Sequence, residues 1–166
     1  MRRRFEAPIL VQKPNAMNLR VLFRSASILW IVWGLVHILA GVLTMSKILS
    51  NDIGGAMAGI SDAVDPDLLE GTYHAAVGAV IGQHGFNLFW IGIVTLLSAL
   101  GVWKGRANAI YLAAITGGLA DLGYFLFMDL GGYVRFVPGT VMTLVSASAI
   151  VLSFYALRRQ NLTAST

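Results

Sequence analysis

The chain contains no cysteine, and charged residues make up only 12% of its 166 positions. The absence of cysteine excludes disulfides, cysteine-ligated zinc, iron–sulfur clusters and thiol catalysis. The scarcity of charge argues against a water-soluble domain, in which charged residues usually supply about 25% of the composition. Hydrophobic residues supply 57% instead, so a soluble domain would have too few polar groups to cover its surface. The composition indicates a membrane protein.

Four long apolar stretches alternate with short charged loops, at residues 26–45, 86–103, 110–128 and 141–157. Each comes close to the ~20 residues that an α-helix, rising about 1.5 Å per residue, needs to cross a hydrocarbon layer ~30 Å thick. We therefore predict an all-α fold, an integral membrane four-helix bundle. Its parts are a basic tail (1–24), one transmembrane domain (25–159) with an outer loop at about 48–73, and a second tail (160–166).

The basic residues are distributed unevenly between the two ends of this bundle. Ten of the twelve fall on the side of the chain termini, and only Lys47 and Arg135 fall on the other side. Lysine and arginine are enriched in cytoplasmic loops, so we predict that both termini and both tails are cytoplasmic. Because these charges sit at helix ends, the net charge of +4 indicates a lipid bilayer as partner and not nucleic acid.

The first 24 residues are basic and lack the periodicity of a helix. Glu6, Lys13, Pro14 and Asn15 interrupt the apolar run that a secretory signal peptide would need. A cytoplasmic tail is one interpretation. The segment 20–25 (RVLFRS) also coincides with the translation of a common sequencing adapter, so a second interpretation is that residues 1–25 are partly artefactual.

The outer loop is rich in glycine and acidic residues. Ser61 or Asp62 is predicted to start a short interfacial helix, and the chain becomes helical again from Glu70. A straight helix over residues 71–103 would be about 50 Å long, more than the bilayer core, so it must protrude, tilt or break, and we predict residues 82–85 as the place of a bend. Pro138 suits the first turn of the fourth helix.

Ionisable residues inside the apolar spans are the candidates for chemistry, because charge at membrane depth is costly and usually faces the bundle interior. His37, His84 and Asp121 are three such residues, in the central to outer half of their spans. Asn87 lies about one turn below His84, and Tyr124 follows Asp121 at i+3. We predict that these five residues form a polar, ligand-binding cluster open toward the outer face.

Plainer interpretations stay open for the same residues. His37 would hydrogen-bond a backbone carbonyl at a close helix crossing, and His84 would be a wetted interfacial residue. Asp121 must be protonated or paired, with Arg135 or a histidine as its partner. Haem held by both histidines, or a metal held by both and Asp121, is less favoured, because the histidines differ in depth and no spaced ligand motif is present. We assign no metal, and any cofactor stays unknown.

The segment Gly34-Leu35-Val36-His37 lies in an arginine-flanked first span. Together with the length and the number of spans, this pattern resembles small four-helix bacterial membrane proteins of the DoxX-like type. The resemblance covers about residues 19–159 as architecture. It implies a bacterial inner (cell) membrane and, from some members, a quinone-linked redox role, and it singles out only His37.

Two functions from different classes follow from these observations. The first is binding of a lipid-like or quinone-like ligand by the polar cluster. The second is a structural or assembly subunit that packs on other membrane proteins or a second copy through glycine-rich helix faces (Gly78, Gly82, Gly117, Gly118). Enzymatic activity ranks third, because we find no hydrolase elbow, phosphate-cradling glycine loop or paired-carboxylate motif.

Overall fold

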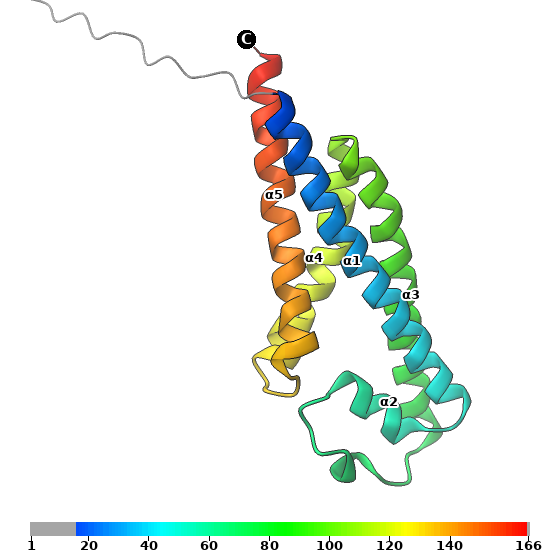
Figure 1. The fold of residues 1–166 in the computed structure, drawn as a ribbon. Helices are drawn as coiled ribbons and strands as arrows, with labels where there is room; N and C mark the ends of the chain where they lie inside the picture. Colours follow the sequence, from blue (N-terminus) through cyan, green and yellow to red (C-terminus); the bar gives the residue numbers. More distant parts are fainter. Residues whose placement is uncertain (1–15, 166) are drawn as a thin grey trace, which may run out of the picture.

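The computed structural model describes residues 16–165 of the chain, and this part is helical with connecting loops (Figure 1). Two wider π-helical turns lie at Phe125–Asp129 and Phe136–Thr140. The outer loop also contains a short 3-10 helix, Pro66–Leu69. The α-helices are α1 (Ala16–Leu49), α2 (Ile53–Ile60), α3 (Ala75–Trp103), α4 (Ala107–Tyr124) and α5 (Val141–Ala164).

Four of these helices are long and apolar enough to cross a membrane, which confirms the predicted all-α bundle of four spans. The spans cover Asn18–Leu49, Ala75–Trp103, Ala107–Asp129 and Phe136–Thr163. Each extends beyond the apolar stretch that identified it, Ala75–Trp103 only at its start and the other three at both ends, because helical hydrogen bonding continues past the stretch. Residues 16–24, expected in the basic tail, accordingly belong to α1. The rest of that tail lies outside the described residues.

The four long helices form a ring in which α1 and α4 each lie between α3 and α5. Figure 1 shows that the chain runs up and down through the bundle, so the start of α1, the α3–α4 loop and the end of α5 share one end. The segment between α1 and α3, including α2, lies at the other end with the α4–α5 loop. We call the first of these the basic end and the second the loop end. The basic end carries six of the described Lys and Arg residues: Arg20, Arg24, Lys104, Arg106, Arg158 and Arg159.

Two pairs of buried glycines bring α1 and α3 into close backbone contact. A Cβ built on Gly34 would lie 2.9 Å from the carbonyl oxygen of Gly92, and one on Gly92 would lie 2.7 Å from that of Gly34. Gly41 and Gly85 repeat the arrangement, with 2.5 Å between a Cβ on Gly41 and the Gly85 oxygen. Both pairs are separated by seven residues on each helix, as two antiparallel helices require for a repeated contact.

The predicted bend in the second span is wrong. α3 is a continuous α-helix from Ala75 to Trp103, and Gly82 and Gly85 lie within it. Its length of 29 residues corresponds to about 43 Å, so the helix exceeds the bilayer core by projecting or tilting. The helix also begins later than predicted. His74 is its N-cap, and the imidazole Nδ1 accepts a hydrogen bond from the Ala76 amide at 3.2 Å.

The outer loop contains a helix, but not where the sequence placed it. α2 ends at Ile60, and Ser61 is its C-cap, whose hydroxyl donates to the Met57 carbonyl at 2.7 Å. Ser61 therefore terminates a helix, although it or Asp62 was expected to start one. The helix forms because Asp52 caps its first turn and Ala56 is buried against the bundle. Burial outweighs the poor helix propensity of Gly54 and Gly55.

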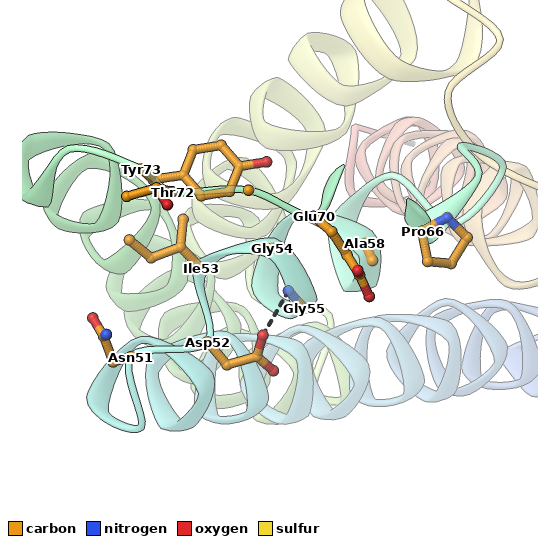
Figure 2. Close-up of a pocket in the computed structure, with 11 residues that line it drawn as sticks. Asn51, Asp52, Ile53, Gly54, Gly55, Ala58, Pro66, Glu70, Thr72 and Tyr73 are labelled. Atoms are coloured by element: carbon orange, nitrogen blue, oxygen red, sulfur yellow. Dashed lines mark hydrogen bonds between the residues drawn. The ribbon is translucent and has the colours of Figure 1, made fainter. Parts of the chain in front are cut away.

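Asp52 connects this short helix to the end of α1. Its carboxylate accepts a hydrogen bond from the Gly55 amide at 2.8 Å and lies 3.1 Å from the Lys47 ammonium. Figure 2 shows the Asp52–Gly55 bond beside a hollow of about 480 Å³ inside the outer loop. The bond from Lys47 and, after it, the bond from Gly55 hold the pKa of Asp52 below its usual value of 3.8.

We expect the Lys47→Met variant to raise the pKa of Asp52 toward 3.8. The pKa is depressed in the folded protein, so this contact adds stability above the unfolded pKa and loses it as the pH falls through the folded value. Titration of the Asp52 carboxyl carbon by NMR measures the change, with Lys104→Met, at the basic end, as the control. An unchanged Asp52 titration in Lys47→Met would contradict the contact.

Two hydrogen bonds connect the loops at the loop end of the bundle. The Arg135 amide donates to the Asp62 carboxylate at 2.7 Å, and the Ala63 amide donates to the Tyr133 carbonyl at 3.1 Å. These bonds join the outer loop to the α4–α5 loop. Pro138 follows the extended residue Val137 (φ −116°, ψ 124°) and opens the helical turn that leads into α5, as predicted.

Asp129 joins the end of α4 to the start of α5. Its two carboxylate oxygens accept hydrogen bonds from the hydroxyls of Thr140, at 2.6 Å, and Thr143, at 3.0 Å. Its place at the end of a π-helical turn brings it back toward α5, where two threonines supply both donors.

Candidate functional site

A cavity of about 290 Å³ lies between the long helices at the loop end, under α2. Its wall is largely apolar and comes from every α-helix of the bundle and from the turn before α5. A small-molecule site is typically a concave, mostly apolar space with a few convergent polar groups. The apolar and small residues of the wall are Val36, Ala40, Leu43, Ala56, Gly59, Ile60, Leu88, Pro138, Gly139 and Met142.

Four of the five predicted site residues line this cavity. His37 comes from α1, His84 from α3, and Asp121 and Tyr124 from α4. Asn87, the fifth, lies outside the wall, and its side-chain oxygen accepts a hydrogen bond from the Trp90 indole at 3.0 Å. Three residues rotate a helix by about 300°, so Asn87 is turned by about 60° from the direction of His84.

The Asp121 carboxylate is buried and has its partners on α1. One oxygen, Oδ2, accepts a hydrogen bond from the Trp33 indole N–H at 2.7 Å. The other, Oδ1, lies 3.7 Å from His37 Nε2, and Ser146 lies on the α5 side of the carboxyl group. The pairing with Arg135 that the sequence allowed is not among the ion pairs of residues 16–165, and Arg135 instead donates its backbone amide to Asp62. The histidine alternative is the one observed.

His37 is fixed in one orientation by three contacts. Its Nδ1 lies 2.9 Å from the Trp33 carbonyl oxygen, and its ring stacks on the Trp33 ring with centroids 3.5 Å apart and planes at 19°. A carbonyl oxygen can only accept a hydrogen bond, so Nδ1 carries a proton. The remaining nitrogen, Nε2, faces Asp121. The carbonyl contact on its own helix agrees with the plainer interpretation of His37, and the Asp121 contact adds to it.

The two groups share a restricted set of protonation states. With Nδ1 protonated, Nε2 is either the acceptor of a neutral imidazole or the second donor of an imidazolium. A neutral imidazole matches a protonated Asp121, and an imidazolium matches an ionised one. At 3.7 Å the two groups are too far apart for a hydrogen bond, so they form an ion pair only when the imidazole is protonated, and both border the cavity.

Two polar residues of the cavity wall were missed in the sequence. Thr44 and Lys47 continue the face of α1 that carries His37, and Lys47 also pairs with Asp52 at the edge of α2. Helical periodicity could have identified them in the sequence. The α1 residues of the wall recur at spacings of one, three and four, which places them on one face of a helix. They are Val36, His37, Ala40, Leu43, Thr44 and Lys47.

The site does not have the arrangement of a metal centre. Within residues 16–165, no three His, Asp or Glu side chains lie together in a way that would hold an ion. For haem, both histidines would have to direct a nitrogen to one iron. His37 instead directs Nδ1 at a carbonyl and Nε2 at a carboxylate. The donor set is better suited to hydrogen bonding than to ligation.

Trp30 and Trp33 are fully buried, so they belong to the core and not to a membrane-surface belt. Their rings meet edge to face, with centroids 6.1 Å apart. Trp33 connects this aromatic core to the cavity through Asp121 and His37. Comparison with protein-family models, curated proteins and solved structures finds no match to this chain.

Proposed function

We propose that this protein binds a lipid-soluble ligand of the quinone class in the cavity at the loop end. The observation that carries the proposal is the composition of the wall, in which His37, His84, Asp121 and Tyr124 are the polar groups predicted for a site and most other residues are apolar. The volume of about 290 Å³ is at the lower end of the range for small-molecule sites. It suits a single substituted ring better than a whole diacyl lipid.

The polar groups match the chemistry of such a ligand. A quinone carries two carbonyl oxygens on a flat apolar ring, and each oxygen accepts hydrogen bonds. The Tyr124 hydroxyl, a His84 ring N–H and the Lys47 ammonium are donors from three different helices. Leu88 and Met142 supply apolar contact for the ring. Asp121 is held by Trp33, so its role would be to orient His37 and set the local charge.

The membrane and its sidedness belong to the same proposal. Six basic residues gather at the basic end, and the positive-inside rule then puts that end in the cytoplasm and the cavity near the outer face. A bacterial inner membrane and membership of the DoxX-like proteins are part of the proposal, supported by the four-span architecture and by the position of His37 in the cavity wall.

The alternative is an assembly subunit that docks through glycine-rich faces. The four glycines that suggested it do not support it. All four glycines pack against the chain itself. A Cβ on Gly78 would meet Ile53, one on Gly82 would meet Ile48, one on Gly117 would meet Trp30, and one on Gly118 would meet Ile150. These four glycines pack within the protein, so they give the assembly alternative no support.

Binding is tested with the protein purified in mild detergent and a short-tailed probe, decylubiquinone. We expect the probe to raise the melting temperature of the wild type, because a ligand that binds only the folded state stabilises it. The Gly59→Leu variant should bind it about tenfold more weakly or not at all. Gly59 lines the cavity, and a Cβ there meets nothing within 4 Å, so a leucine is accommodated without a backbone clash and is expected to reduce the room for the probe.

Gly123→Leu is the matched control. It makes the same substitution in a helix, again with nothing within 4 Å of the new Cβ, but outside the cavity wall. It should keep the wild-type response to decylubiquinone. Equal responses of the wild type, Gly59→Leu and Gly123→Leu would place any binding elsewhere and overturn the proposal. The absence of a thermal shift in the wild type at saturating probe would do the same.

A further inference from the structure

A second open hollow lies at the basic end, on the side of the bundle formed by α3 and α4. It is a groove of about 1010 Å³ between the last turns of α3 and the first turns of α4. Leu97, Leu100 and Leu112 form its apolar wall, and their side chains are exposed in the isolated chain (62%, 60% and 46%). Both helices are membrane spans, so this wall faces the lipid.

The mouth of the groove is cationic. Lys104 and Arg106, in the three-residue loop between α3 and α4, both line it and are exposed. Among residues 16–165, neither forms an ion pair, since the pairs there are His37–Asp121 and Lys47–Asp52. The acidic residues of this part of the chain lie at the loop end or deeper in the bundle (Asp52, Asp62, Asp65, Asp67, Glu70, Asp121, Asp129).

The start of α4 adds further donors at the same place. Arg106 is its N-cap residue and makes no side-chain capping bond, so the first amides of α4 stay available to an anion beside the two cationic side chains. The floor of the groove is closed by a tight approach of the helices, since a Cβ on Gly101 would collide with the Ala109 methyl group. An occupant therefore enters from the lipid side.

From the leucine wall and the cationic mouth, we propose that this groove binds an anionic phospholipid. The acyl chains lie along the leucine wall, and the phosphodiester meets Lys104, Arg106 and the start of α4. Basic pockets between transmembrane helices are suited to anionic lipid headgroups. The apolar wall favours a lipid over free phosphate, because only the acyl chains can bury apolar surface against it. This site lies at the opposite end of the bundle from the cavity under α2, and the inference is independent of the quinone proposal.

The test uses delipidated full-length protein and counts bound lipid by native mass spectrometry. We expect dioleoylphosphatidylglycerol to remain bound at one per chain where dioleoylphosphatidylcholine does not. The double variant Lys104→Gln/Arg106→Gln should bind the anionic lipid about 30-fold more weakly. Arg158→Gln/Arg159→Gln removes the same charge from α5 at the same end, outside the groove, and should bind as the wild type does.

A second pair of variants tests the apolar wall. Leu97→Asn should weaken binding of the anionic lipid, while Leu119→Asn, with a similar exposure of 63% outside the groove, should not. If Lys104→Gln/Arg106→Gln and Arg158→Gln/Arg159→Gln weakened lipid binding equally, the lipid would be attracted to the basic end in general. That result would overturn the site. Displacement of the lipid by millimolar inorganic phosphate, or equal effects of the two asparagine variants, would overturn the assignment to a lipid.

Discussion

The Gly41→Ala variant is expected to unfold at a temperature roughly 2–12 °C below that of the wild type. The added methyl group would lie 2.5 Å from the Gly85 carbonyl oxygen and 2.6 Å from the Phe89 amide nitrogen. Both are backbone atoms of α3, so no side-chain rotation relieves the collision and the helices must separate. Overpacking of this kind costs about 1–3 kcal/mol, which corresponds to about 2–4 °C per kcal/mol for a chain of this size.

The sign of the effect is as informative as its size. An alanine in a helix is otherwise more favourable than a glycine by about 1 kcal/mol. Gly123→Ala, in α4, meets nothing within 4 Å and should leave the melting temperature unchanged or raise it. Thermal unfolding of both variants in one detergent, followed by circular dichroism, makes the comparison. A Gly41→Ala protein as stable as Gly123→Ala would contradict the close crossing of α1 and α3.

This crossing was predictable in part, because a close helix crossing was one interpretation of His37, which lies between Gly34 and Gly41, but its partner helix was not identified. Gly34 and Gly41 are seven residues apart, and so are Gly85 and Gly92. In antiparallel neighbours, such matched spacings predict a repeated contact. The glycine-rich faces predicted to contact a partner, which include Gly78 and Gly82, instead pack within the chain. A spacing shows which residues share a face, but not which element covers that face.

The polar cluster was predictable for a different reason. His37 and Asp121 are conspicuous because charge in an apolar span has to face the bundle interior, whatever the neighbouring helix is. Their partners were less accessible, because the contact between Trp33 on α1 and Asp121 on α4 joins residues 88 positions apart. One sequence gives the depth of each residue, but not how each helix is rotated. The same lack of information misplaced Asn87, which shares a depth with the site but not a direction.

The outer loop shows where local signals fail. Two adjacent glycines and an acidic run are typical of a flexible loop. The helix was therefore predicted to start after the glycines, at Ser61 or Asp62. The structure places a helix over the glycines because Asp52 caps it and Ala56 packs against the bundle. Asp52 as a cap was visible in the sequence. The burial that compensates for two glycines was not, since it depends on where the loop crosses the bundle end.

Substitution of Asp121 is expected to separate its structural role from its role in ligand binding. In Asp121→Leu, the Trp33 indole N–H loses its acceptor while fully buried. A buried donor without a partner costs about 1–3 kcal/mol, so the melting temperature should fall by roughly 2–12 °C. In Asp121→Asn, the amide oxygen still accepts from Trp33, and the amide NH₂ group can donate toward Nε2 of a neutral His37. This variant should stay within about 2 °C of the wild type.

The same pair of variants then tests the site. If the charge of Asp121 beside His37 contributes to ligand binding, Asp121→Asn should lose the thermal shift produced by decylubiquinone although its fold is intact. Asp121→Leu should lose both stability and the shift. A fall in stability of Asp121→Asn as large as that of Asp121→Leu would mean that the negative charge holds α1 to α4. Asp121 would then be a structural residue, and the candidate site would have to rest on His84, Tyr124 and Lys47.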